Sequence, residues 1–387
     1  MIKIKEIEFR NILNSVGKIA LEVQMTTDRG ISEIASTPSA IIPGRREVLS
    51  TNILGNDLLN KLLEEIYNIE IENQKEFDNI LNNYIEKIGT NICLALSLAF
   101  ARVFAKNEKI TLVEYIYKQS NIQNENISPK PLVTIFSGGV HSEKAKGSIQ
   151  NIMISVNIHP FSKAVKAITE IYTDIENKLK QKNLLKGYGA SSGMIVDNMS
   201  TNEKFEMVTK SIEELKLNKE VSIAIDVAAE HFYKNGKYIY EENMVDSEEL
   251  NEIFVEYIRK YNITYIEDPF DSADEKWWKK FREENPNILL VGDDLFATQE
   301  KYINNKLANG IIIKMNQVGT LTGTINAFKK ARCEKMLTCV SHRSIETEDT
   351  FMCDLAVALN AEYIKIGGPR RGDRITKYNR LLRLEEV

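Results

Sequence analysis

The chain has 387 residues, of which 43% are hydrophobic and 27% are charged. These values are ordinary for a globular protein, so they exclude disordered, collagen-like and coiled-coil chains, and the length indicates two domains or one large α/β barrel with an extension. With 50 Lys and Arg against 55 Asp and Glu, the net charge is −5. A protein that binds the phosphate backbone of nucleic acids is expected to be basic, so we expect no nucleic-acid partner.

No segment has the pattern of a membrane span or a signal peptide. The longest apolar run, residues 92–101, is roughly half as long as a bilayer requires. Residues 1–10 alternate between aliphatic and charged side chains, which is typical of a strand. We therefore expect a cytoplasmic protein without a membrane partner. The four cysteines lack C-x-x-C spacing, and we expect buried free thiols at Cys93, Cys333, Cys339 and Cys353.

The first third of the chain predicts strands followed by helices. Apolar residues at about every second position between residues 2 and 35 predict strands, with a turn at residues 28–30. Residues 56–88 and 89–106 have helical patterns, and the second has so few polar positions that we expect a buried helix. Together these elements predict an N-terminal α+β domain.

A mostly polar stretch with two prolines, residues 120–132, follows this region. Such a composition is typical of a linker. We therefore place the domain boundary there and predict domains at residues 1–125 and 126–387.

Short apolar strands alternate with helical stretches after the boundary. Each strand is largely apolar along its body, as expected when both faces are covered, and six strand–helix units predict a parallel α/β barrel. The helical patterns cover residues 247–260, 275–284 and 321–333. The strands are VSIAID (221–226), ITYIED (263–268), NILLVGDD (287–294), IIIKMN (311–316), MLTCVSH (336–342) and AEYIKIG (361–367).

Polar side chains follow these strands where each strand ends. In a parallel barrel the carboxyl ends of the strands meet at one rim, which carries the catalytic groups. Acidic residues at three successive strand ends and a lysine at the fourth indicate a site and not merely solvent-facing ends. The rim residues are Asp226, Glu267, Asp268, Asp293, Asp294, Lys314, His342, Arg343, Ser344 and Lys365.

Three of these carboxylates predict a metal site. Carboxylates that face one another repel, and a divalent cation relieves that repulsion. Oxygen ligands without His or Cys favour Mg²⁺, or Mn²⁺, over Zn²⁺. We predict that Asp226, Glu267 and Asp293 are the ligands. Because side chains alternate along a strand, we expect Asp268 and Asp294 to point elsewhere and to support the ligands.

Lys314 and Lys365 end the later strands. A lysine beside a divalent cation loses its proton more easily, because like charges repel, and can then act as a general base. We predict that Lys314 removes a proton alpha to a carboxylate, while the metal stabilises the resulting enolate. A structural ion pair is the alternative for Lys314. For Lys365, an ion pair and a contact with the substrate are both open.

The run from Ser341 to Ser344 combines an arginine fork with hydroxyl groups, which suits an oxyanion such as a phosphate or phosphonate. The alternative for Arg343 is an ion pair with Glu346 or Glu348. His159 and His231 have no ligand partners at metal spacing, so we expect them to be structural or exposed.

Several segments, in a fixed order, resemble the enolase family (phosphopyruvate hydratase). Residues 12–15, 91–101 and 137–141 share the resemblance, which covers nearly the whole chain. It implies an N-terminal α+β domain, a C-terminal TIM-like barrel with an unusual start, and a homodimer. The strongest segments are IAIDVAAEHF, YIEDPFD, VGDDL, IKMNQVGTLT, VSHRSIETEDTF, IKIGGP and KYNRLLRLEE.

The resemblance also implies roles for individual residues. Enolase-superfamily sites in general combine a Lys or His base with one or two Mg²⁺ ions. The implied metal ligands are Asp226, Glu267 and Asp293, and the implied base is Lys314. We assign His342 and His141 to the catalytic residues as well, and we expect Arg343, Ser344, Lys365 and Gln150 to bind substrate.

Three positions depart from the family's pattern. Ile42 stands where the loop PSGASTG carries a serine that reaches a second Mg²⁺. Ser191 and Asn151 stand where GDEGG and QEFMI carry glutamates. The residues for metal, carboxylate and phosphate are thus retained, whereas the acids that help hydroxide leave are absent. Loss of acid assistance costs about 10²- to 10⁴-fold in rate.

These observations leave three interpretations. The first is a diverged enolase-family enzyme that forms an enolate from a small phosphorylated or phosphonylated carboxylic acid, the phosphonate by analogy with one branch of the family. The second is an ordinary enolase, which converts 2-phosphoglycerate to phosphoenolpyruvate. The third is a non-catalytic paralogue with a binding role, which the retained metal and lysine residues disfavour. A neighbouring biosynthetic operon, or a second, complete enolase gene in the same genome, would separate the first two.

Overall fold

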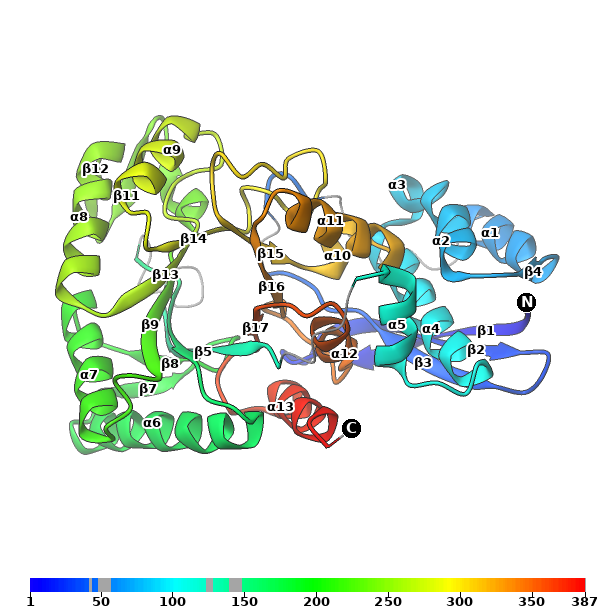
Figure 1. Ribbon diagram of the computed structural model, residues 1–387, viewed down its shortest axis with the longest axis horizontal. Coiled ribbons are helices and arrows are strands. Elements are labelled where there is room, and N and C mark those ends of the chain that lie inside the picture. Colours follow the sequence, from blue (N-terminus) through cyan, green and yellow to red (C-terminus); the bar gives the residue numbers. More distant parts are fainter. Residues whose placement is uncertain (42–43, 48–56, 123–127, 139–147, 387) are drawn as a thin grey trace.

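The computed structural model describes residues 1–41, 44–47, 57–122, 128–138 and 148–386. Figure 1 shows a barrel of strands surrounded by helices and, at the other end of the long axis, a smaller part in which helices pack beside an antiparallel sheet. This architecture confirms the predicted α+β part followed by an α/β barrel.

The N-terminal sheet contains the three strands predicted between residues 2 and 35. They are β1 (Ile2–Leu13), β2 (Ile19–Thr27) and β3 (Ser32–Ser36), and with β4 (Glu70–Ile71) they form an antiparallel sheet of order β3-β2-β1-β4. The predicted buried helix is α4 (Thr90–Asn107), which is buried along nearly its whole length and contacts β2 and β3.

The prediction of helix throughout residues 56–88 is wrong. This region holds α1 (Asp57–Tyr67), the edge strand β4, α2 (Gln74–Asn82) and α3 (Ile85–Ile88). The side chain of Asn73 accepts a hydrogen bond from the backbone N–H of Glu76 at 3.0 Å, so a new helix begins there.

The barrel is closed, and its second strand runs against its neighbours. The strand β6 is antiparallel to both β5 and β9, whereas the remaining neighbours are parallel and β17 pairs with β5. The ring consists of β5 (Lys130–Ser137), β6 (Asn151–Val156), β9 (Val221–Asp226), β13 (Ile263–Glu267), β14 (Leu289–Gly292), β15 (Gly310–Ile313), β16 (Leu337–Ser341) and β17 (Tyr363–Lys365).

The predicted linker, residues 120–132, extends too far toward the C-terminus. The strand β5 begins at Lys130, and Leu132 is fully buried inside the barrel. The sequence analysis did not predict β5 and β6, because these two strands lie outside the regular alternation of strands and helices.

Helices and short strands complete the fold. The three helical patterns of the barrel region are confirmed as α8 (Ser247–Lys260), α9 (Glu275–Glu284) and α11 (Leu321–Cys333). The other elements are α5 (Leu112–Ser120), α6 (Phe161–Gln181), β7 (Leu185–Tyr188), β8 (Met194–Val196), α7 (Thr201–Glu214), β10 (Tyr233–Lys234), β11 (Lys237–Tyr240), β12 (Asn243–Val245), α10 (Met315–Val318), α12 (Phe351–Ala358) and α13 (Gly372–Leu384).

Apolar side chains fill the barrel below its rim. They form a cluster of their own, separate from the larger core between the strands and the helices. Because this interior is packed, ligands have access only at the rim, where the polar strand ends lie. The cluster consists of Leu132, Met153, Ala224, Tyr265, Val291, Ile312 and Cys339.

Several contacts between charged or polar groups hold the N-terminal part on the barrel. Arg102 in α4 forms a two-bond ion pair with Asp349, with N–O distances of 2.7 and 2.8 Å. Asp78 in α2 is buried and accepts hydrogen bonds from the Ser97 hydroxyl at 2.6 Å and from the backbone N–H of Thr322 at 2.8 Å. The rim is therefore held beside the loops of the N-terminal part.

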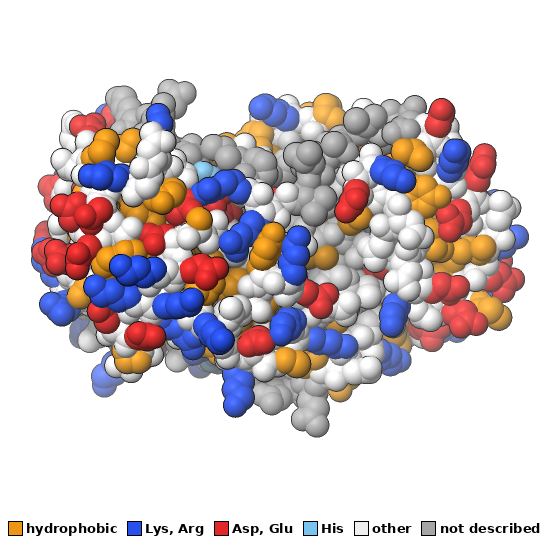
Figure 2. Space-filling view, turned by 90° about the horizontal axis from the view of Figure 1, so that it is seen from above, with side chains coloured by type: hydrophobic (Ala, Val, Ile, Leu, Met, Phe, Trp, Pro, Cys, Tyr) orange, Lys and Arg blue, Asp and Glu red, His pale blue; other side chains and the backbone are white. Residues whose placement is uncertain are grey.

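Charged side chains of both signs lie on the described surface. On the face drawn in Figure 2, acidic and basic side chains are interspersed over the described residues. No helix in the described ranges is both long and apolar enough to cross a bilayer. Cys93, Cys339 and Cys353 are buried as predicted, but Cys333 is exposed because it ends α11 on the solvent side.

Candidate functional site

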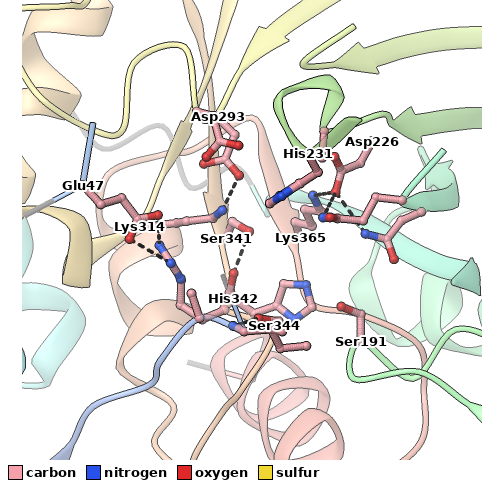
Figure 3. Close-up of a pocket in the computed structure, with 17 residues that line it drawn as sticks. Glu47, Ser191, Asp226, His231, Asp293, Lys314, Ser341, His342, Ser344 and Lys365 are labelled. Carbon is pink, nitrogen blue, oxygen red and sulfur yellow. Dashed lines mark hydrogen bonds and ion pairs between the residues drawn. The ribbon is translucent and has the colours of Figure 1, made fainter. Parts of the chain in front are cut away.

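The carboxyl ends of the barrel strands surround one cavity, as predicted for the rim (Figure 3). Glu267, the last residue of β13, and Asp268, which follows it, are buried and do not line it. The predicted residues that do line it are Gln150, Asp226, Asp293, Asp294, Lys314, His342, Arg343, Ser344 and Lys365, together with Asn151 and Ser191.

Lys365 forms ion pairs with two of the predicted metal ligands. Its Nζ lies 2.8 Å from Asp226 Oδ2 and 2.8 and 3.0 Å from the two oxygens of Glu267. Burial alone would lower the pKa of Lys365, but the charges of Asp226 and Glu267 outweigh burial and hold the pKa above its usual value. Lys365 is therefore a protonated counter-charge to these carboxylates.

One lysine does not compensate both carboxylates. Burial, together with the nearby charge of Asp226, raises the pKa of Glu267 to about 8. The hydroxyl of Tyr265 donates to Glu267 Oε2 at 3.0 Å, which orients the carboxylate. Buried carboxylate oxygens are donors that suit a hard divalent cation. Among the described residues, the acidic side chains that could hold an ion together, with ligand atoms within 4.8 Å of one another, are Asp268, Asp293 and Asp294. The assignment of Asp226 and Glu267 as ligands together with Asp293 stays a prediction.

Lys314 follows β15 and pairs with the third predicted ligand. Its Nζ donates to Asp293 Oδ2, and the Gln317 amide lies 3.4 Å from Asp293 Oδ1. Burial would raise the pKa of Asp293, but Lys314 outweighs it and keeps the pKa low. The predicted base thus lies beside the predicted metal ligand.

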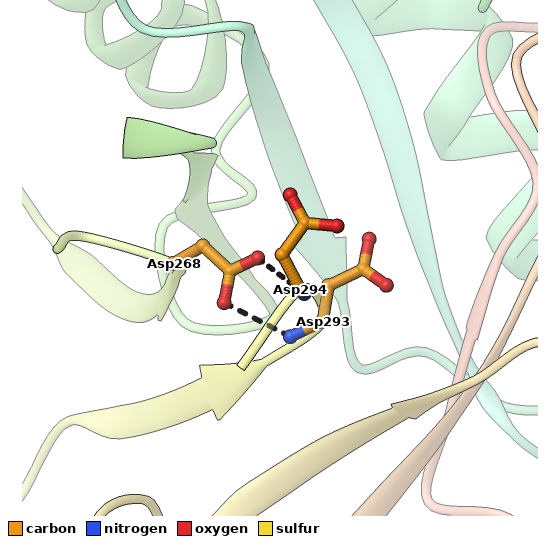
Figure 4. Close-up of side chains that lie close together, drawn as sticks. All are labelled: Asp268, Asp293 and Asp294. Carbon is orange, nitrogen blue, oxygen red and sulfur yellow. Dashed lines mark hydrogen bonds between the residues drawn. The ribbon is translucent and has the colours of Figure 1, made fainter. Parts of the chain in front are cut away.

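The carboxylate of Asp268 supports the turn after β14. It accepts hydrogen bonds from the backbone N–H groups of Asp293 at 3.0 Å and Asp294 at 2.7 Å (Figure 4). Asp268 therefore has a supporting position, as expected. The prediction that Asp294 points away is wrong, since it lines the cavity. Strand alternation does not apply to Asp294, because β14 ends at Gly292.

Arg343 is paired with an acid that the sequence analysis did not single out. Its two terminal nitrogens each lie 2.9 Å from an oxygen of Glu47, and both side chains are buried, at 4% and 8% exposure. The alternative of an Arg343 side-chain pair with Glu346 or Glu348 is wrong. Glu346 instead accepts from the backbone N–H of Arg343 at 2.8 Å.

Ser344 and His342 flank Arg343. The Ser344 hydroxyl accepts a hydrogen bond from the backbone N–H of Ile41 at 3.0 Å. The Nδ1 atom of His342 is hydrogen-bonded to the guanidinium of Arg374. Burial and the charge of Arg374 hold the pKa of His342 well below its usual value, so this imidazole is neutral.

The two amides at the start of β6 both contact Asp226, a predicted metal ligand. The Asn151 amide donates to Asp226 Oδ2 at 3.0 Å, and the Gln150 amide lies 3.3 Å from the same oxygen. Asn151 therefore positions Asp226, which sequence reasoning did not predict. Ser191 lines the cavity and is 2% exposed. His141 and Ile42 lie outside the described residues.

His231 also lines the cavity, which contradicts its expected structural or exposed position. It lies in a 3₁₀ turn, Ala229–Phe232, directly after β9. Burial lowers the pKa of His231, although the charge of Asp226 opposes this. The signal available in the sequence was its distance of only five residues from the strand-end acid Asp226.

Comparison with known proteins gives matches to both parts of the chain. The family model described as "Enolase, N-terminal domain" matches residues 4–116, and the one described as "Enolase, C-terminal TIM barrel domain" matches residues 125–387. Proteins named Enolase from Elusimicrobium minutum and Ehrlichia ruminantium (strain Gardel) are each 32% identical to this chain. Their alignments cover 100% of this chain and 96% and 97% of the relatives' own lengths.

Proposed function

This chain belongs to the enolase family, and we propose that it is a diverged member that forms an enolate from a small phosphorylated or phosphonylated carboxylic acid. The observation that carries the proposal is that Lys314, Arg343, Asp226 and Asp293 line a single cavity. A base, an anion-binding fork and cation-binding carboxylates are the groups that this chemistry requires.

The carboxylates of Asp226, Glu267 and Asp293 would hold Mg²⁺, or Mn²⁺. When bound, the ion supplies positive charge that stabilises the negative charge developing on the enolate oxygens. Lys365 holds Asp226 and Glu267 in place through its ion pairs. In its neutral form, Lys314 accepts the proton from the carbon alpha to the carboxylate. Arg343 binds the phosphate or phosphonate in place of Glu47, and Ser344 adds a hydroxyl.

Two neutral side chains support a diverged reaction over ordinary enolase chemistry. Ser191 lines the cavity, but it carries a hydroxyl group and not a carboxylic acid. The Asn151 amide donates a hydrogen bond to Asp226. Neither can protonate a departing hydroxide in the neutral range, so dehydration of 2-phosphoglycerate is expected to be at least about 10²-fold slower than in a complete enolase. Ordinary enolase activity is the second candidate, because the curated relatives named Enolase align over the full chain.

The test is hydrogen exchange at the alpha carbon. The protein is incubated in D₂O with Mg²⁺ and a panel of two- to four-carbon phospho and phosphono acids that includes 2-phosphoglycerate, and proton NMR follows the alpha signal. Exchange is expected in the wild type and in Lys306→Ala, which removes an exposed lysine, and not in Lys314→Ala. No exchange with any acid contradicts the proposal, and formation of phosphoenolpyruvate at ordinary enolase rates identifies an ordinary enolase.

The homodimer, a further proposal from the family, is tested by analytical ultracentrifugation.

A further inference from the structure

A buried arginine outside the cavity lining joins two loops that form part of the cavity wall. Arg374, in the first turn of α13, is fully buried. Its Nη2 atom donates to the backbone carbonyl oxygens of Ala190, Arg343 and Ser344, each at 3.0 Å. The first of these carbonyls directly precedes Ser191, and the other two belong to the segment after β16. Both segments carry residues that line the cavity.

The other terminal nitrogen of Arg374, Nη1, is hydrogen-bonded to the Nδ1 atom of His342. A guanidinium carries donors and no acceptor. Although burial lowers the pKa of Arg374, the usual value of a guanidinium is so high that the group keeps its charge at neutral pH. Nδ1 of His342 must therefore accept this hydrogen bond with its lone pair, which places the proton of the neutral ring on Nε2.

The charged groups that act most strongly on the His342 ring are all cations. Burial lowers the pKa of the imidazole well below its usual value, and the charges of Arg374, Lys365, Lys314 and Lys377 add to this effect. A divalent cation on the rim would act in the same direction. The ring is therefore neutral whether or not a metal ion is bound.

The edge of the ring that carries Nε2 is left for the cavity. His342 lines the cavity, and Figure 3 shows its ring on the wall with Ser191 beside it in this view. The backbone of Gly367 packs so closely that a Cβ there would lie 3.2 Å from His342 Cε1 and 3.2 Å from Arg374 Cδ. Within the described part of the chain, Nε2 has no hydrogen-bond partner. Its N–H group is thus available to an acceptor atom of a ligand.

From this arrangement we infer that Arg374 is a positioning residue, which fixes His342 as the tautomer protonated on Nε2, and that the ring donates a hydrogen bond to an oxygen of the substrate. The inference rests on the proposed function, which supplies an anionic acid as the substrate. A neutral ring whose Nδ1 is engaged neither takes up nor gives away a proton, so Lys314 remains the proposed base. The N–H group favours a phosphate, phosphonate or carboxylate oxygen at this wall over an apolar group, because an unpaired buried donor costs free energy.

The first experiment identifies the tautomer in the protein without ligand. Two-bond ¹H–¹⁵N NMR spectra of ¹⁵N-labelled protein distinguish a protonated ring nitrogen from an unprotonated one. The chain has four histidines, and the signals that vanish in His342→Gln identify those of His342. We expect an unprotonated Nδ1 and a protonated Nε2, unchanged between about pH 6 and pH 8, where an ordinary histidine titrates.

Replacement of Arg374 tests whether this side chain sets the tautomer. In Arg374→Met, which removes the donors, we expect the His342 ring to populate both neutral tautomers. The control Arg259→Met changes an exposed arginine and should leave the His342 signals unchanged. A purely Nε2-protonated ring in folded Arg374→Met overturns the role of Arg374. The wild-type spectrum and the binding experiment test the inference even if this variant does not fold.

The second experiment tests the contact with the substrate. The amide nitrogen of a glutamine side chain reaches the position of histidine Nε2, whereas that of asparagine reaches only the position of Nδ1. We therefore expect His342→Gln to bind 2-phosphoglycerate, with Mg²⁺ present, within about 3-fold of the wild type, and His342→Asn to bind it about 10-fold more weakly. Calorimetry measures the affinities. The control His159→Gln changes an exposed histidine and should match the wild type.

Three further results overturn the inference. A protonated Nδ1, or a doubly protonated ring, in the wild type contradicts the assigned tautomer. Equal affinities in His342→Gln and His342→Asn contradict the contact with the substrate while leaving the proposed function intact. Failure of the wild type to bind any acid of the panel used for hydrogen exchange contradicts the proposed function and with it the contact, and the wild-type NMR spectrum then separates that failure from an error in the tautomer.

Discussion

Glu47 occupies both arms of the Arg343 guanidinium, with two N–O distances of 2.9 Å. The pair is buried, and the charge of Glu47 outweighs burial and raises the pKa of Arg343. An arginine fork that binds a carboxylate in two bonds has the geometry that it would use for a phosphate. In the proposed reaction Glu47 therefore holds the place of the substrate's phosphate, and a phosphate that binds Arg343 has to displace it.

Glu47→Gln is expected to bind inorganic phosphate about 10- to 100-fold more tightly than the wild type. The reason is that hydrogen bonds to charged groups contribute about 1.5–3 kcal/mol, and the variant removes a charged competitor. Calorimetric titration with phosphate measures the change. Glu348→Gln makes the same change in net charge at an exposed position and should match the wild type. Equal affinities in Glu47→Gln and the wild type would show that Glu47 does not compete.

One tight Mg²⁺ site is expected, formed by Asp226, Glu267 and Asp293. Asp293→Asn should weaken Mg²⁺ binding about 10-fold or more, because a charged ligand is replaced by a neutral one. Calorimetry in the presence of a phospho acid gives both stoichiometry and affinity. Two tight sites per chain would contradict the stoichiometry, and unchanged affinity in Asp293→Asn would exclude it as a ligand.

Lys365→Met is expected to make folding dependent on the metal. Removal of Lys365 leaves Asp226 and Glu267 buried without a counter-charge, which should cost about 3–5 kcal/mol of unfolding free energy. Mg²⁺ should recover part of this loss, because a ligand that binds only the folded state stabilises it. Urea denaturation with and without Mg²⁺ measures both effects. The control Lys330→Met removes a surface pair with Glu334 and should change stability by less than about 1 kcal/mol.

Restoring the absent acids is expected to succeed at only one of the two positions. Ser191→Glu places a carboxyl group at the cavity wall and should raise the dehydration rate of 2-phosphoglycerate about 10-fold or more. Asn151→Glu removes the amide that donates to Asp226 at 3.0 Å and adds a repelling carboxylate. It should therefore weaken Mg²⁺ binding and slow the reaction. Equal gains in rate from both variants would contradict the assigned position of Asn151.

Asp349→Asn is expected to destabilise the protein in a pH-dependent manner. Burial would raise the pKa of Asp349, but Arg102 outweighs it and lowers the pKa below the usual value. A carboxyl group with a lowered pKa stabilises the fold above its unfolded-state pKa, near 4, and loses that contribution as the pH falls through its folded-state pKa.

The loss in Asp349→Asn should therefore be about 3–5 kcal/mol at pH 7, where Arg102 is left without its partner, and should be smaller below about pH 4. Urea denaturation at a series of pH values gives the comparison. A difference between variant and wild type that does not shrink on acidification would contradict this reading of the pair.

Much of the fold, and the placement of several rim residues at one cavity, could be predicted from the sequence by itself. Strands such as 221–226 and 263–267 are apolar runs that end at acidic residues, and both the run and its end are local properties of the chain. The rule that parallel strands end at one rim then brings Asp226, Asp293 and Lys314 together. The early strands β5 and β6 escaped prediction because β6 breaks the parallel order.

Only the tertiary structure decided which partner each charged side chain takes. Glu47 and Arg343 are 296 residues apart, and Asn151 reaches Asp226 only because β6 and β9 pair in register. The placement of His231 depends on a turn tied by hydrogen bonding to another strand. Periodicity records which face of an element is buried, whereas these contacts depend on the distance and direction between side chains that only the closed barrel brings together.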